Sequence, residues 1–214
     1  SGSNLIRPCT TFQKNDLLQG QLKLSRDDRR HVSRSTEETP EAPTVRDPVA
    51  RSDGVTLPHA SADGDGRVVD FRPYEPSDRE AVRSFYESFE PTDRSQGVPP
   101  AAPTALDEWL STVTAAPSVV ATHDDRVVGH VTFVPDRSGE HELGLFVAPA
   151  YRRAGVGTEL LQTGLTHARQ SAVSTVWLSV ERENEAARRL FRRTGFVETS
   201  ETAFTVYATR SVDV

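Results

Sequence analysis

The most constraining segment of the chain runs from residue 142 to residue 172, where a strand-like pattern changes into a helical one. Residues 142–147 (ELGLFV) have the composition of a β-strand, and residues 158–172 have the spacing of an amphipathic helix. Between them lies a basic, glycine-rich turn, residues 151–158 (YRRAGVGT). Such a turn at the start of a helix presents backbone N–H groups and the positive end of the helix dipole to an anion. The segment therefore predicts a strand–loop–helix unit that binds a diphosphate.

The glycines and arginines of this turn have separate expected roles. Gly155 and Gly157 let the backbone approach phosphate oxygens closely. Arg152 and Arg153 add charge-assisted hydrogen bonds. A dinucleotide-binding fingerprint would need a third glycine where Leu160 stands, and the acidic residue about twenty positions further on is also missing. The pattern favours a diphosphate loop over a Rossmann site, and a plain connecting turn is the structural alternative.

A second block follows over residues 176–196. It is expected to form a strand over residues 176–180, a short loop, a helix over residues 185–193 and a glycine stop before another strand. Its pattern, Asn-x-x-Ala-x-x-Leu-Phe-x-x-x-Gly-Phe, is carried by Asn184, Ala187, Leu190, Phe191, Gly195 and Phe196. Each residue taken singly is explained by helix capping or core packing. Two blocks in this order and at this separation are harder to explain in that way.

Together the two blocks resemble the GCN5-related N-acetyltransferases, the GNAT family. Arg-x-x-Gly-x-Gly, preceded by Val-x-Pro-x-Tyr, matches the coenzyme A pyrophosphate loop of that family, and the second block matches its following strand and helix. The resemblance covers roughly residues 67–210. It implies an α/β (α+β) fold, in which a mixed, mostly antiparallel sheet is flanked by helices and splays after the strand at residues 141–147 to admit a cofactor.

The resemblance also implies how acetyl-CoA would be held as a co-substrate. The pantetheine arm is expected to add like a strand to the backbone edge of Leu145, Phe146 and Val147. The pyrophosphate is expected on the loop formed by Arg152, Arg153, Ala154, Gly155, Val156, Gly157 and Thr158. Asn184 is expected to contact the pantetheine arm, and Ala187, Leu190 and Phe191 are expected to flank it near the thioester.

The implied reaction moves an acetyl group to an amine by direct attack in a ternary complex, without a metal or a covalent enzyme intermediate. The acceptor would be a small-molecule amine, or a lysine or N-terminal amine of a protein. Many relatives use a tyrosine as the acid where this chain has Phe191, so Tyr207 on a late strand is the substitute candidate. A non-catalytic acyl-CoA-binding sensor is the alternative function, and an unrelated binder of a phosphate ligand is a third.

The general base is open between two neighbouring residues. The position that some relatives use for their base is held here by His141, whose ordinary pKa is also near neutral. Glu142, beside it, is the runner-up. Neighbouring strand residues face opposite sides, so only one of the two faces the cleft. Relatives that place the base on the next strand have it where this chain has Ser179, and Glu181 would share the face of Ser179.

Composition limits location and partners. The net charge of −6 does not favour nucleic acid, and no apolar run approaches the length of a membrane span. The single cysteine, Cys9, forbids an internal disulfide and suits a reducing compartment. We therefore expect a cytoplasmic protein, monomer or homodimer, with neither nucleic-acid nor membrane partners.

The chain is expected to divide near residue 66. Residues 1–66 are rich in proline and acidic residues with few apolar periods, which predicts a disordered or loosely ordered N-terminal extension. A short helix or strand is expected there at most over residues 17–24. Residues 67–214 have regular strand and helix patterns and are expected to form the acetyltransferase domain.

Overall fold

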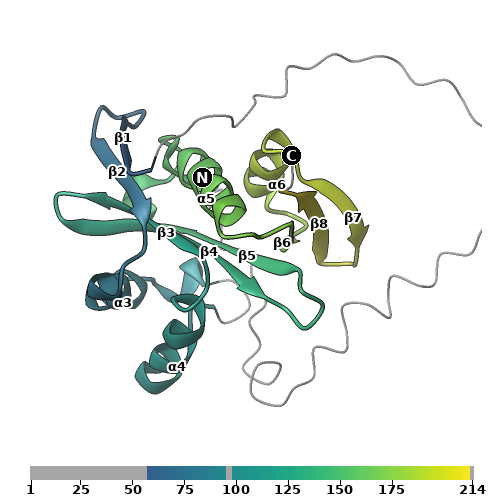
Figure 1. Ribbon diagram of the computed structural model, residues 1–214, viewed down its shortest axis with the longest axis horizontal. Coiled ribbons are helices and arrows are strands. Elements are labelled where there is room, and N and C mark those ends of the chain that lie inside the picture. Colours follow the sequence, from purple (N-terminus) through teal and green to yellow (C-terminus); the bar gives the residue numbers. More distant parts are fainter. Residues whose placement is uncertain (1–56, 95–97, 213–214) are drawn as a thin grey trace, which may run out of the picture.

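The computed structural model describes residues 57–94 and 98–212 (Figure 1). Its helices and strands, with three 3-10 turns labelled η, are in chain order β1 (His59–Ala62), β2 (Val68–Pro73), η2 (Pro76–Asp78), α3 (Arg79–Glu87), η3 (Pro91–Asp93), α4 (Pro103–Val113), β3 (Ser118–His123), β4 (Arg126–Pro135), β5 (His141–Val147), η4 (Pro149–Tyr151), α5 (Val156–Gln170), β6 (Thr175–Glu181), α6 (Glu185–Arg193), β7 (Val197–Glu201) and β8 (Thr205–Ser211). None of the described helices is long and apolar enough to cross a membrane.

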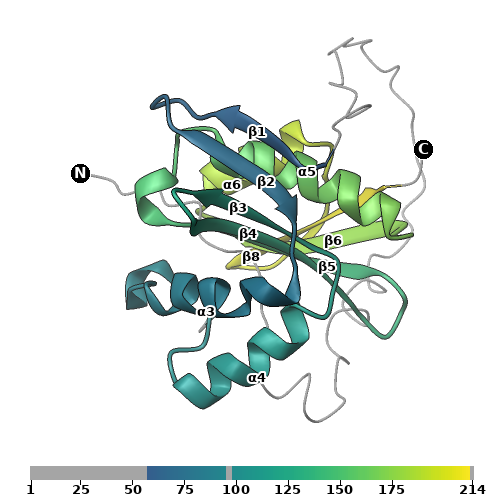
Figure 2. The ribbon, with the colours of Figure 1, turned by 60° about the vertical axis from the view of Figure 1, so that its left-hand side comes forward.

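The strands form one eight-stranded sheet in the order β1-β2-β3-β4-β5-β6-β8-β7. Every neighbouring pair is antiparallel except β5 and β6, which run parallel. Helices α3 and α4 lie on one side of the sheet and α5 on the other (Figure 2). The mixed, mostly antiparallel sheet with flanking helices is the predicted fold.

The parallel pair β5–β6 is the point at which the sheet opens. Both strands have seven residues, yet they are in register only at His141 with Val176 and at Glu142 with Trp177. From Gly144 onwards β5 remains paired with β4 but has no register partner on β6. The predicted splay therefore starts after Glu142, and residues 144–147 of β5 have no strand partner on that side among the described residues.

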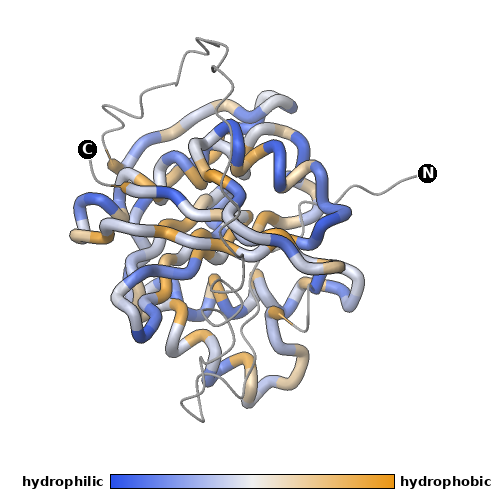
Figure 3. The backbone as a smooth tube through the Cα atoms, turned by 90° about the vertical axis from the view of Figure 1, so that its right-hand side faces the viewer, coloured by the Kyte–Doolittle hydropathy of each residue, from blue (hydrophilic) through white to orange (hydrophobic). Residues whose placement is uncertain are grey.

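Alternation along the strands divides the buried side chains between two cores, because successive residues point to opposite faces of a sheet. On β5, Leu143, Leu145 and Val147 belong to the core beneath α5 and α6. Phe146 belongs to the other core, with the aromatic residues of α3 and α4. In Figure 3 the hydrophobic stretches run mainly through the middle of the molecule and the hydrophilic ones lie mainly at its edge. Both faces of the central strands are thus buried.

Strand β1 lies in the segment that was predicted to be a disordered or loosely ordered extension. Ala62 pairs with Val68, so residues 63–67 form the turn of a β1–β2 hairpin, and the predicted division at residue 66 falls inside it. The sequence of β1, HASA, has no β-branched or large apolar residue to mark a strand. Tertiary contacts order it: the His59 ring stacks on Phe71 at 5.2 Å between centroids. Cys9 and the element expected over residues 17–24 lie outside the described residues.

Candidate functional site

The loop between β5 and α5 is built to expose backbone amides. Gly155 is the N-cap of α5 with φ 92°, and it offers no side chain to cap the first helical N–H groups. Arg153 also has a positive φ of 66°, which is unfavourable for a residue with a Cβ. Strain of this kind clusters at ligand-binding loops. The start of α5 therefore has the helix N-terminus without a side-chain cap on which the predicted anion site depends.

A groove of about 290 Å³ lies over this helix start. Its walls come from the end of β5, from the loop and from helix α6, and it is lined by Val147, Arg152, Arg153, Gly155, Gly157, Thr158, Ala186, Arg189, Leu190 and Arg193. Seven of these residues were expected around the cofactor, namely Val147, Leu190 and five from the loop. The groove therefore joins the β5 edge to the amide-rich loop.

Arg152 has a structural role that its sequence position did not reveal. Its Nη1 donates to Asp93 Oδ1 at 2.7 Å, and its Nε donates to the carbonyl oxygen of Val147 at 2.9 Å. The Arg152 side chain is only 5% exposed and that of Asp93 only 8%. The Nη2 atom of Arg152 is buried without a hydrogen-bond partner. Most of the Arg152 guanidinium thus holds the loop against η3, and only its Nη2 atom has no acceptor among the described residues.

The second predicted block contributes differently from the expectation. Asn184 caps α6, because its Oδ1 accepts from the backbone N–H of Ala187 at 3.2 Å. Ala187 and Phe191 are buried in the core, where the Phe191 ring lies 5.7 Å from that of Phe196. Of the four α6-block residues expected around the cofactor, only Leu190 lines the groove.

The side chains of α6 that do face the groove were missed. They are Ala186, Arg189 and Arg193. With Leu190 they follow one another at spacings of three or four residues, so they form one stripe along the helix. That spacing was readable in the sequence, since each of them lies three or four positions from Leu190 or from another member. The residues that the family pattern marks, such as Ala187 and Phe191, lie on the buried side of the same helix.

The predicted proton-transfer residues fall on two faces of the sheet. Glu142 stands beside Val134 and Trp177, and Val134 belongs to the core under α3 and α4. Tyr207 stands opposite Ser179, whose neighbours Leu178 and Val180 point to the α5 and α6 side. Glu142, Ser179 and Tyr207 therefore share the face that α3 and α4 cover.

His141 faces the other way. Its register partner Val176 is fully buried in the core beneath α5 and α6. Desolvation lowers the pKa of His141 below its ordinary value, partly offset by the charge of Asp136, so the imidazole is neutral at pH 7. Between the two candidate bases, the structure places Glu142, and not His141, on the same face as Tyr207.

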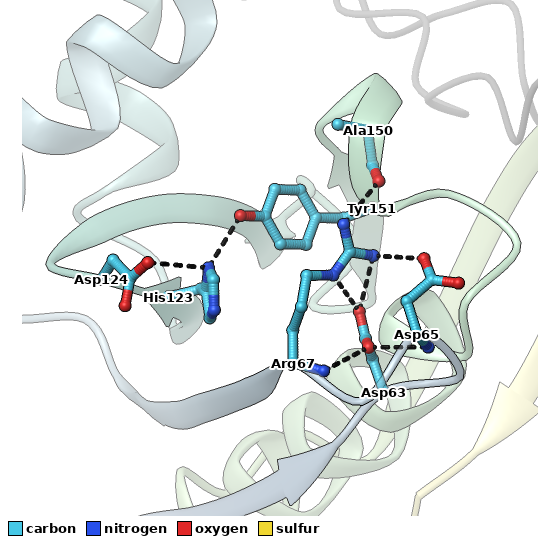
Figure 4. Close-up of polar contacts among 7 residues, drawn as sticks. All are labelled: Asp63, Asp65, Arg67, His123, Asp124, Ala150 and Tyr151. Atoms are coloured by element: carbon cyan, nitrogen blue, oxygen red, sulfur yellow. Dashed lines mark hydrogen bonds and ion pairs between the residues drawn. The ribbon is translucent and has the colours of Figure 1, made fainter.

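The β1–β2 hairpin supports the segment between β5 and α5 from outside (Figure 4). Arg67 donates to Asp63 Oδ2 at 2.7 Å, to Asp65 Oδ2 at 2.9 Å and to the carbonyl oxygen of Ala150 at 3.0 Å. Its guanidinium carbon lies 4.2 Å from the centre of the Tyr151 ring, a cation–π geometry. The hairpin is thereby fixed to η4, immediately before the arginines of the loop.

Two further contacts complete this support. The hydroxyl of Tyr151 lies 2.9 Å from His123 Nδ1, which ties η4 to β3. The backbone N–H of Gly64 donates to the carbonyl oxygen of Ala154 at 2.7 Å. A Cβ at residue 64 would lie 3.4 Å from that oxygen, so the hairpin turn packs directly on the loop. The hairpin missed by the sequence analysis is therefore part of the framework of the site.

The structure thus combines a sheet that opens between β5 and β6 with an arginine-lined groove at the start of α5. The family model of the Acetyltransferase (GNAT) family matches residues 80–196, more than half of the chain. The chain belongs to the GNAT family of acetyltransferases.

Relatives in sequence include an uncharacterized N-acetyltransferase of Mycobacterium tuberculosis (strain H37Rv), 32% identical over 79 residues. That match covers 36% of this chain and 51% of the mycobacterial protein. The camello protein of Xenopus tropicalis is 39% identical over 80 residues, 36% of each chain. The chain thus matches about half, or less, of the length of these relatives.

Solved structures share the fold. The GNAT domain of PAT from S. lividans superposes with a TM-score of 0.59 at 18% identity, covering 72% of this chain and 96% of that domain. The yncA protein of Salmonella typhimurium, solved with its cofactor acetyl-CoA, gives a TM-score of 0.56 at 19% identity, covering 68% and 94%. At this identity the likeness concerns the fold.

Proposed function

We propose that the protein is an acetyl-CoA-dependent N-acetyltransferase that moves an acetyl group to an amine. The observation that carries the proposal is the groove at the start of α5, which leads to the unpaired edge of β5 at the splay. The lining residues include four arginines and no acidic residue. The buried, unpartnered Nη2 of Arg152 fits an anionic cofactor as well, because a buried guanidinium donor is costly to leave without an acceptor.

Binding of the cofactor would use three parts of the chain. The amides of residues 153–157 and the α5 dipole would hold the pyrophosphate. The edge of β5 along residues 145–147 would pair with the pantetheine amides as an added strand. The thioester would then lie where β5 and β6 diverge, next to Glu142. This placement leaves the α3 and α4 face of the sheet for the acceptor amine.

Glu142 and Tyr207 would manage the protons. We assign Glu142, rather than His141, as the base that takes a proton from the acceptor ammonium, because it shares the acceptor face with Tyr207. The neutral amine would attack the acetyl carbonyl, and backbone donors would hold the oxyanion. Tyr207 would return a proton to the coenzyme A thiolate. A thiolate with a pKa of about 8.5 is a tolerable leaving group, so the acid contributes less than the base.

The test combines binding with turnover. Acetyl-CoA is titrated calorimetrically into the protein, and thiol release is then followed with a panel of small amines and lysine peptides. Micromolar binding with amine-dependent thiol release would support the transferase and begin to define its acceptor. Absence of acetyl-CoA binding would overturn the proposal.

The second candidate function is a non-catalytic acyl-CoA sensor. The observation in its favour is Phe191, which stands where many relatives have an acidic tyrosine and is buried in the core. Acetyl-CoA binding without thiol release from any acceptor in the panel would favour the sensor. Steady release that depends on an amine would exclude it.

A further inference from the structure

The arginines that line the groove are only partly neutralised by acidic residues of the described chain. Arg152 is neutralised by Asp93. Arg189 has an exposed partner one helical turn away, Glu185, at 3.3 Å. Neither Arg153 nor Arg193 forms an ion pair with any other part of the described chain.

These cations are in two groups on opposite walls. Arg152 and Arg153 lie on the loop, just before the first residues of α5. Arg189 and Arg193 project from α6, one turn apart on the stripe that faces the groove. Their Cα atoms are separated by about 6 Å along the helix axis, so two long side chains can converge on a single anion.

A diphosphate uses only the first group. It carries about two negative charges, which the loop amides, the α5 dipole, Arg153 and Arg152 Nη2 can satisfy. On α6, Arg193 is then left without an anion, and Arg189 has only the exposed carboxylate of Glu185. A ligand that matches the whole groove therefore needs a second, separate anionic group on the α6 side. A phosphomonoester suits this wall because guanidinium groups form paired hydrogen bonds with its oxygens.

Given the proposed function, on which this step rests, the second anion belongs to the same cofactor. Coenzyme A carries a phosphomonoester on the 3′ position of its ribose, close to the pyrophosphate. We propose that Arg189 and Arg193 bind this 3′-phosphate, and that the protein thereby selects coenzyme A over 3′-dephospho-coenzyme A. The α6 wall is then a specificity determinant that is separate from the pyrophosphate loop.

Helix α6 supplies a matched control. Arg192 is exposed, immediately precedes Arg193, and lies beside Phe191 and Phe196, away from the groove. Arg192→Ala removes the same charge from the same helix. It separates contact with the phosphate from a general change in the field of the protein.

The experiment measures the affinities of coenzyme A and 3′-dephospho-coenzyme A for the full chain by calorimetry, at low and at moderate salt. We expect the parent to bind coenzyme A about tenfold more tightly, as two exposed charge-assisted contacts would give. The Arg189→Ala, Arg193→Ala double variant should lose that preference, with its affinity for the dephospho form changed less than twofold. Arg192→Ala should keep it.

Three outcomes would overturn the inference. Equal affinity of the parent for both ligands would mean that α6 does not read the 3′-phosphate, although the proposed function would stand. A preference that survives in the double variant would place the phosphate elsewhere. Binding of neither ligand would remove the proposed function, and the inference with it.

Discussion

Asp93 and Arg152 form a buried ion pair, with 2.7 Å between Oδ1 and Nη1, across 59 residues of sequence. The pair joins η3, which follows helix α3, to the loop that starts the cofactor groove. Since α3 and α4 cover the proposed acceptor face, the ion pair is a direct connection between the acceptor side and the cofactor side of the site.

The first prediction concerns this pair. Asp93→Ala should lower the free energy of unfolding by about 3–5 kcal/mol, because it leaves the Arg152 charge buried without its partner. Urea unfolding measures the change. The control is Glu201→Ala in the exposed pair with Arg182, where both side chains are about half exposed and the expected change is below about 1 kcal/mol. Equal small effects at both sites would show that the buried pair does not brace the loop.

The second prediction concerns the cap of α5. Gly155→Ala should cost about 1–2 kcal/mol through its backbone conformation alone, because φ is 92° and an added Cβ would meet nothing within 4 Å. Coenzyme A affinity should fall with it, since relief of the strain moves the loop amides. Gly155→Asn should be milder in both measurements, because asparagine tolerates the left-handed region. Equal losses with alanine and asparagine would point to a cause other than backbone conformation.

The third prediction uses a glycine of a different kind. A Cβ at residue 164 on α5 would lie 2.6 Å from Val131 Cγ1 and 3.2 Å from the Phe133 ring. Gly164→Ala should therefore destabilise the fold by about 1–3 kcal/mol through overpacking. Its coenzyme A affinity, measured below the unfolding transition, should match that of the parent. A loss of affinity as large as that of Gly155→Ala would mean that the groove responds to the packing of α5 as a whole.

The sequence predicted those parts of the fold and site that depend on local pattern. The loop, the start of α5 and the strand–helix succession follow from glycines, turn residues and periodicity. Strand β1 was not predictable in this way, since its short polar sequence is ordered by Phe71 and by pairing with β2. The same holds for Arg152, whose loop position suggested a ligand contact while its partner Asp93 is distant in sequence. A local sequence pattern does not reveal contacts between residues that are far apart in the sequence.

The fourth prediction separates the two candidate bases. Glu142→Gln should lower kcat by about a hundredfold or more, because it removes a general base while keeping shape. His141→Gln should change kcat by less than about threefold, since His141 faces the other side of the sheet. Both variants should bind acetyl-CoA as the parent does, which calorimetry checks. A large loss with His141→Gln and a small one with Glu142→Gln would reverse the assignment.

The fifth prediction concerns His130 on β4, which is fully buried and lies 2.7 Å through Nδ1 from the hydroxyl of Tyr86. Desolvation lowers the pKa of His130 to about 3, against an opposing effect of the Asp78 charge. The unfolded chain takes up this proton near the ordinary pKa of 6.5, whereas the folded chain stays neutral until about pH 3. The contribution of neutral His130 to stability is therefore complete above pH 6.5 and is lost as the pH falls.

The test compares the parent with His130→Asn by urea unfolding between pH 7 and pH 4.5. The variant should be less stable at pH 7, because it leaves a space beside Tyr86 and Tyr74. Below pH 6 the parent should lose up to about 1.4 kcal/mol per pH unit that the variant does not lose, so the difference between them should narrow. His141 and His167, whose pKa values are also lowered, contribute equally to both proteins and cancel in the difference. A difference that stays constant with pH would show that His130 takes up its proton as readily in the folded chain as in the unfolded chain.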